Sequence, residues 1–87
     1  MARNLKIVYF AWVKERLGRE GEQVELGDDL QTVGDLISKL SSQDPSIESV
    51  FSDITKLRFA LDQDFVDLNA HIGDAEELAI FPPVTGG

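Results

Sequence analysis

One amphipathic helix pattern, at residues 32–40, constrains the fold of this chain more than any other feature of the sequence. Its apolar positions recur at spacings of three and four residues and form one stripe: Val33, Leu36, Ile37 and Leu40. A helix with one apolar stripe must bury that stripe against a second layer. The rest of the chain carries mainly short strand patterns, so the second layer is predicted to be a small β-sheet.

Residues at both ends of this pattern indicate where the helix begins and ends. Thr32 can cap the N-terminus, and Asp35 approximates a capping box, with Asp in place of the usual Glu. Four residues are expected to end the helix: Ser41, Ser42, Asp44 and Pro45. A second, shorter helix is predicted within residues 46–56.

Five segments are rich in β-branched and aromatic residues or alternate between polar and apolar residues. The predicted strands are residues 5–10, 22–26, 57–61, 65–68 and 77–81. A short helical turn closed by Gly18 is expected at residues 11–17. The first two strands should therefore form an antiparallel pair with a wide connection. Periodicity alone supports a small α+β fold.

Size and charge exclude several classes of protein. With 87 residues, the chain is long enough for one domain with one small core, and too short to enclose a deep catalytic cavity as well. The net charge of −8 opposes binding to nucleic acid phosphates. No apolar run approaches the roughly 18 residues of a membrane span. The first residues have no signal-peptide layout, so a cytoplasmic location is expected.

The charges are unevenly distributed along the chain. Residues 1–19 carry five basic groups and one acid, whereas residues 20–87 carry fifteen acids and three bases. An ordinary solvated surface explains this pattern, and an acidic face that steers a basic partner is the alternative. Asp62, Asp64 and Asp67 lack the spacing of a calcium loop, so a solvated hairpin turn is predicted there and no metal site.

The chain has no cysteine and one histidine, which removes most side-chain chemistry. A disulfide, a thiolate nucleophile and a cysteine-ligated metal are excluded, and a Ser-His-Asp triad is disfavoured. His71 precedes a Gly-Asp turn and is predicted to be a surface or packing residue. Any chemistry must therefore use a group other than a side-chain nucleophile.

The most informative segment is the last one, Phe81-Pro82-Pro83-Val84-Thr85-Gly86-Gly87. The two prolines lack a backbone N–H and fix φ, so strand pairing should end there and the chain should leave in an extended form. We therefore predict a globular part at residues 1–81 and a flexible tail at residues 82–87.

The two glycines suit entry into a narrow active site of another enzyme. Gly86 and Gly87 have no Cβ to block a tunnel, and Val84 can contact a groove in a partner. A sterically open carboxylate at Gly87 can be activated as an acyl-adenylate and converted to a new acyl group. A frayed end without function is the alternative.

Four segments together carry a family resemblance: residues 7–15, the helix start Thr32-Val33, residues 73–78 and the Phe-Pro-Pro-Val-Thr-Gly-Gly ending. They are similar to the small, sulfur-carrier subunits of molybdopterin synthase, a ubiquitin-like β-grasp family. The resemblance covers essentially the whole chain. The ending is its most specific part, because related carriers share the two glycines but usually lack Phe-Pro-Pro. At Lys14 the family often has arginine.

The resemblance implies a ubiquitin-like β-grasp, a mixed β-sheet with one main helix packed across it and a projecting tail. It implies that Gly87 is adenylated by a ubiquitin-activating-like adenylyltransferase that uses ATP, and is then converted to a thiocarboxylate. The sulfur would pass to cyclic pyranopterin monophosphate in the large subunit of a heterotetrameric synthase and form the dithiolene. The chain would be a sulfur-donating cosubstrate without a tightly bound cofactor or metal, and not an enzyme on its own.

Three residues are predicted to recognise partners. Phe10, Lys14 and Phe81 lie at the ends of the first and last strands, which the β-grasp places side by side and parallel in the centre of the sheet. Trp12 either covers the core or joins Phe10 and Phe81 in an apolar patch.

Three other functions remain compatible with the sequence. A sulfur carrier of thiamine thiazole synthesis shares the activation chemistry. A protein modifier would join Gly87 to lysines through isopeptide bonds. A plain interaction domain would use no C-terminal chemistry.

Overall fold

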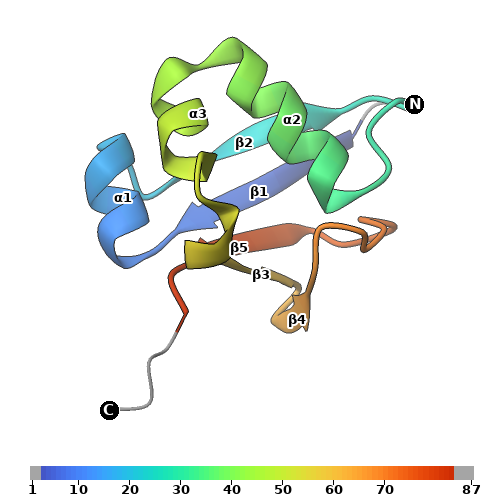
Figure 1. The fold of residues 1–87 in the computed structure, drawn as a ribbon. Helices are drawn as coiled ribbons and strands as arrows, with labels where there is room; N and C mark the ends of the chain where they lie inside the picture. Colours follow the sequence, from blue (N-terminus) through green and yellow to red (C-terminus); the bar gives the residue numbers. More distant parts are fainter. Residues whose placement is uncertain (1–2, 84–87) are drawn as a thin grey trace.

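A five-stranded mixed β-sheet carries helices on one face, in a computed structural model that describes residues 3–83 (Figure 1). The strands are β1 (Arg3–Tyr9), β2 (Gly21–Leu26), β3 (Arg58–Leu61), β4 (Asp64–Val66) and β5 (Glu77–Phe81). The helices are α1 (Ala11–Leu17), α2 (Val33–Gln43), α3 (Pro45–Phe51) and the 3₁₀ helix η1 (Ile54–Lys56). Within the described residues, no helix is long and apolar enough to cross a membrane.

The spatial order of the strands is β2-β1-β5-β3-β4, with β1 and β5 parallel in the centre. The other three neighbouring pairs are antiparallel. Tyr9 lies opposite Ile80 in the β1–β5 register, so these two strands end together. This arrangement confirms the predicted ubiquitin-like β-grasp.

The core lies between the sheet and α2, where the predicted stripe is buried. Alternate residues of β1 and β5 face it, and the side chains exposed by 1% or less include Leu5, Ile7, Tyr9, Val33, Leu36, Leu78 and Ile80. Strand alternation therefore leaves the intervening side chains of β1 and β5 on the face of the sheet without helices.

The predicted capping box of α2 is confirmed. The Thr32 hydroxyl accepts a hydrogen bond from the Asp35 N–H, and the Asp35 carboxylate accepts from the Thr32 N–H, each at 3.1 Å. The Gln31 N–H donates to the same carboxylate oxygen at 3.2 Å. The backbone N–H groups of Thr32 and Gln31 lower the pKa of Asp35.

The predicted end of this helix is wrong, because α2 continues past Leu40 to Gln43. Serine is tolerated in the last turn, where the Ser42 hydroxyl donates to the Lys39 carbonyl at 2.7 Å. The helix ends at Asp44, which precedes Pro45 and is extended, as proline requires of its neighbour.

Other boundaries also differ from the prediction. One short helix was predicted within residues 46–56, whereas the structure has two helical elements there: α3, which begins at Pro45, and η1 after it. The predicted strand at residues 65–68 is shorter and forms β4. Phe10 lies outside β1, as the N-cap residue of α1.

Replacing Asp35 by asparagine should remove the stabilisation that the ionised Asp35 carboxylate gives to the fold. A carboxylate with a lowered folded pKa stabilises the fold above the unfolded pKa of about 3.9, and this contribution is lost as the pH falls through the folded pKa. Asp35→Asn should therefore reduce stability to urea at pH 7 and make little difference at pH 2. An equal loss at both pH values would contradict this assignment.

Candidate functional site

The chain leaves the sheet beside the start of α1. The Phe10 N–H donates to the Ile80 carbonyl at 3.1 Å, and this hydrogen bond continues the pairing of β1 with β5 by one residue beyond Tyr9. Strand β5 ends at Phe81, directly before Pro82, as predicted. Figure 1 shows the described chain leaving β5 away from both the sheet and the helices.

An aromatic pair lies on the helix-free face of the sheet near this exit. The rings of Phe65 in β4 and Phe81 in β5 lie 5.7 Å apart between centroids, tilted by 53°. Ala60 of β3 lies beside Phe65, its partner in β4, and pairs with Ala79 of β5 on its other side. Val8 of β1 continues the row, opposite Ala79.

We call these residues the apolar strip: Val8, Ala60, Phe65, Ala79 and Phe81. The Phe65 residue is 80% exposed and Phe10, beside the strip's β5 end, is 48% exposed. These two are the exposed large hydrophobic residues of the described chain. Exposed aromatic side chains grouped on one face are typical of a protein–protein interface.

The structure brings the three predicted partner-binding residues together. Phe10 is the extended N-cap residue of α1, and the Lys14 N–H donates to the Phe10 carbonyl at 3.5 Å. Phe81 follows Ile80, the acceptor of the Phe10 N–H. The Lys14 ammonium also lies 3.4 Å from the Glu20 carboxylate, an exposed ion pair that a partner can displace.

Phe65 was missed by the sequence analysis. Its position depends on the two-residue turn between β3 and β4, where Asp62 and Gln63 both have positive φ, of 47° and 75°. Such a turn sets the register that places Phe65 opposite Ala60. The available signal was a phenylalanine that follows a short turn between acidic residues.

Trp12 covers the core. Its half-buried side chain packs against the buried cluster, and the Arg16 guanidinium carbon lies 5.7 Å from the centroid of the ring. The ring and the guanidinium form a cation–π contact.

The acidic turn has a structural role. One Asp62 carboxylate oxygen accepts from the N–H groups of Glu76 and Glu77, each at 3.0 Å, and so ties the hairpin to the start of β5. Residues 3–83 contain no group of three or more potential ligands that could hold a metal ion. His71 is exposed and forms an isolated bridge with Thr32.

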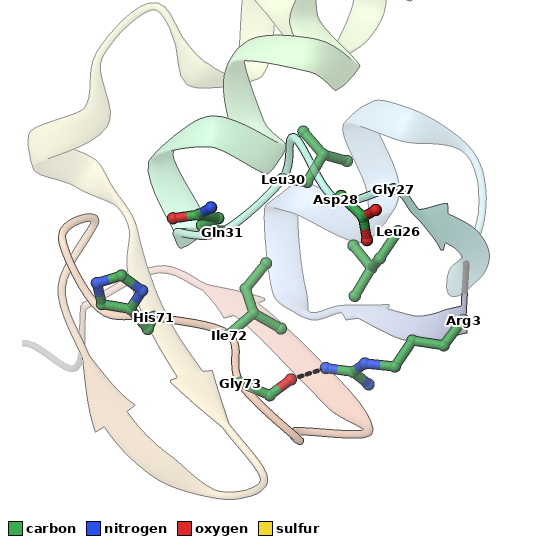
Figure 2. A pocket seen from close by; sticks show the side chains of 9 residues that line it. All are labelled: Arg3, Leu26, Gly27, Asp28, Leu30, Gln31, His71, Ile72 and Gly73. Carbon is green, nitrogen blue, oxygen red and sulfur yellow. Dashed lines mark hydrogen bonds between the residues drawn. The ribbon is translucent and has the colours of Figure 1, made fainter. Parts of the chain in front are cut away.

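A hollow of about 290 Å³ lies at the other end of the sheet, near the start of β1 (Figure 2). Its apolar lining includes Leu26, Leu30 and Ile72, which are all buried. Arg3 lies at its rim and donates to the carbonyls of Gly73 and Ala75. Since β1 and β5 are parallel, this hollow is remote from the end of β5 and lies outside the candidate site.

The predicted tail is described in part. Pro82 and Pro83 follow β5 without further strand structure. Val84, Thr85, Gly86 and Gly87 lie outside the described residues. The candidate site is therefore built from Phe10, Lys14 and the apolar strip, which are all among the described residues.

Comparison with known proteins identifies relatives over nearly the whole chain. The profile of the ThiS family matches residues 7–87. The molybdopterin synthase sulfur carrier subunit of Chlamydomonas reinhardtii is 36% identical and aligns over 97% of this chain and 99% of its own length. The subunit of the same name from Escherichia coli is 34% identical, over 95% of this chain and 99% of its own length.

A solved structure agrees with this relationship. SAMP1, the small archaeal modifier protein 1 of Haloferax volcanii, superposes with a TM-score of 0.75 and 30% identity, covering 98% of this chain and 100% of the SAMP1 chain. Because the family profile and the sequence relatives both span almost the full length, this chain belongs to the ThiS family.

Proposed function

We propose that this chain is the sulfur carrier of a molybdopterin synthase, in which Gly87 carries the sulfur as a thiocarboxylate. The observation that carries the proposal is the place where the chain leaves the sheet. Strand β5 ends at Phe81, which contacts Phe65 and lies beside the exposed Phe10. A partner that docks on these aromatic residues receives residues 82–87 at a fixed point. Sulfur is proposed as the transferred atom because the relatives are named sulfur carrier subunits of molybdopterin synthase.

The reaction uses the main chain rather than a side chain. A Gly87 carboxylate oxygen attacks the α-phosphorus of ATP on an activating adenylyltransferase, and pyrophosphate leaves. A persulfide sulfur of a partner then displaces AMP from the carbonyl, and a thiol cleaves the sulfur–sulfur bond and leaves the thiocarboxylate. This chain has no cysteine, so both the persulfide and the thiol belong to partners.

Two such thiocarboxylates, delivered in succession, each donate one sulfur to cyclic pyranopterin monophosphate in the large subunit, and hydrolysis releases each Gly87 again as a carboxylate. The two sulfur atoms together form the molybdopterin dithiolene. In this proposal the large subunit holds the pterin and supplies the catalytic side chains. The small subunit is a cosubstrate without a cofactor of its own and acts in the cytoplasm, where ATP is available. Its apolar strip and Phe10 supply the docking surface.

A protein modifier is the second candidate, because a structure 30% identical to this chain is named a modifier protein. Both functions begin with the adenylation of Gly87 and differ in the acceptor. Isopeptide bonds to lysines of other proteins would support the modifier, whereas transfer of sulfur to a pterin supports the carrier.

The first test of this function is an intact mass. After co-expression with the activating enzyme and a sulfur source, the chain should gain the mass of one oxygen replaced by sulfur, located on the C-terminal peptide. An unmodified chain from a preparation in which the activating enzyme consumes ATP would contradict the sulfur-carrier function.

Docking should depend on the exposed aromatic pair. Phe65→Glu should weaken binding to the large subunit by about 2 kcal/mol, or roughly 30-fold, as for an aromatic hot spot. The fold should survive, because the residue is 80% exposed. Gln23→Glu is the matched control, since it adds the same charge to exposed β2 at the other edge of the sheet. Equal affinities for the two variants would remove Phe65 from the interface.

The length of the tail should control chemistry without controlling stability. One residue added after Gly87 shifts the carboxylate by about 3.5 Å, whereas a misplacement of about 1 Å can cost on the order of 100-fold in rate. The extended chain and a chain without Gly86-Gly87 should form almost no molybdopterin in a reconstituted assay and should melt like the wild type. Normal product from an extended chain that stays untrimmed would show that Gly87 is not the reacting group.

A further inference from the structure

A cluster of four polar side chains joins the end of β1 to the α1–β2 turn and to the junction of α2 and α3. The Tyr9 hydroxyl donates to a Glu22 carboxylate oxygen at 2.6 Å, and the Arg19 Nε donates to the same oxygen at 2.8 Å. A terminal nitrogen of Arg19 donates to Asp44 at 3.2 Å, and the guanidinium carbon lies 5.8 Å from the centroid of the Tyr9 ring. We call these residues the Arg19 cluster.

Arg19 is the hub of this cluster. Its planar guanidinium serves two carboxylates at once, in a geometry that lysine cannot reproduce. Asp44 is both the C-cap of α2 and the N-cap of α3, so the contact fixes the turn after α1 to the helix layer. The side chains of Arg19, Glu22 and Asp44 are only 28–34% exposed, which shields the ion pairs from solvent more than a typical surface pair.

Protonation keeps the cluster intact around neutral pH. Burial, followed by the hydrogen bond to Glu22, raises the pKa of Tyr9, so its hydroxyl remains a donor. A hydrogen bond from the Ser46 N–H, together with Arg19, lowers the pKa of Asp44, so that carboxylate remains charged.

The segment that the cluster anchors carries two of the partner-binding residues. Residues 10–19 connect β1 to β2 and contain α1, whose seven residues are too few for a stable isolated helix. The segment begins with a corner at Ala11, a non-glycine residue with φ of 54°, a conformation that residues with a Cβ rarely adopt. Contacts elsewhere must hold this corner closed.

Two sets of contacts do so from opposite ends. At the start, the Phe10 N–H bonds to Ile80 of β5. At the end, Gly18 caps α1 in the left-handed conformation, the Tyr9 N–H donates to the Glu20 carbonyl at 2.8 Å, and Arg19 makes the side-chain contacts. The buried side chains of Val13 and Leu17 attach the middle of α1 to the core.

We infer that Arg19 is a positioning residue, which holds α1 so that Phe10 and Lys14 face the docking partner beside the exit of the tail. The inference rests on the proposed function, because it assigns the role through docking. Arg19 itself acts from the far end of α1, through Glu22 and Asp44. With the cluster broken, the C-terminal end of α1 loses its side-chain contacts with Glu22 and Asp44. Binding must then also restrain α1, and that entropy cost lowers affinity.

The variants are Arg19→Ala, Arg19→Lys and Glu22→Gln, with Thr32→Ala as the control. Thr32→Ala removes the side-chain cap of α2 and should lower the melting temperature by about 5 °C without touching the cluster. Each variant is titrated with the large subunit well below its melting temperature. Amide hydrogen exchange of Phe10, Val13 and Lys14 is measured in the free chain.

Arg19→Ala should weaken binding roughly three- to tenfold and speed exchange at the three amides. Arg19→Lys should lose less affinity than Arg19→Ala and should show slower exchange at the three amides. Glu22→Gln should weaken binding less than Arg19→Ala. Thr32→Ala should leave both unchanged. If Arg19→Ala behaves like Thr32→Ala in both measurements, the inference is wrong. If the wild-type chain does not bind the large subunit, the proposed function fails, and hydrogen exchange alone still decides whether Arg19 holds α1.

Discussion

The parallel pairing of β1 and β5 is the contact on which the rest of the structure depends. It places β1 and β5 in the centre of the sheet and makes them end level with each other, with Tyr9 opposite Ile80. A parallel pair needs a crossover connection, and the intervening residues supply it as the helix layer that covers one face. The same pairing sets the start of α1 beside the point where the chain leaves the sheet, so the core and the candidate interface share one backbone register.

The two faces of this sheet have different tasks. Leu78 and Ile80 of β5 point into the core, whereas Ala79 and Phe81 lie on the face without helices. The described residues contain no cysteine, and the hollow near Arg3 lies at the opposite end of the sheet. The helix layer therefore encloses the core on one face, and the other face is left to carry the exposed apolar strip.

Local features of the sequence predicted most of the helices and strands. Contacts between residues far apart in the chain could not be predicted from such features. The capping box at Thr32 depends on neighbours within a few residues, so the pattern alone indicated it, whereas the end of α2 was predicted three residues too early. The exposure of Phe65 depends on a strand register, and the contact of Arg19 with Asp44 joins residues 25 positions apart. Neither can be derived from periodicity, because each requires the packed arrangement of several elements. The candidate interface residues Phe10 and Phe81 were accessible from sequence only through the β-grasp resemblance, which supplied the pairing of the first and last strands.

Net charge and exposed aromatic residues balance each other in this chain. Phe65 and Phe10 expose apolar surface that, on a neutral protein, would favour association between identical copies. A net charge of −8 makes two copies repel each other, whereas a partner with complementary charges meets no such barrier. Lys14 and Arg58 lie near Phe10 and Phe81 respectively, so each of these aromatic residues has a basic neighbour. Long-range repulsion against a second copy and short-range aromatic contact with a partner therefore act together to select the partner over the chain itself.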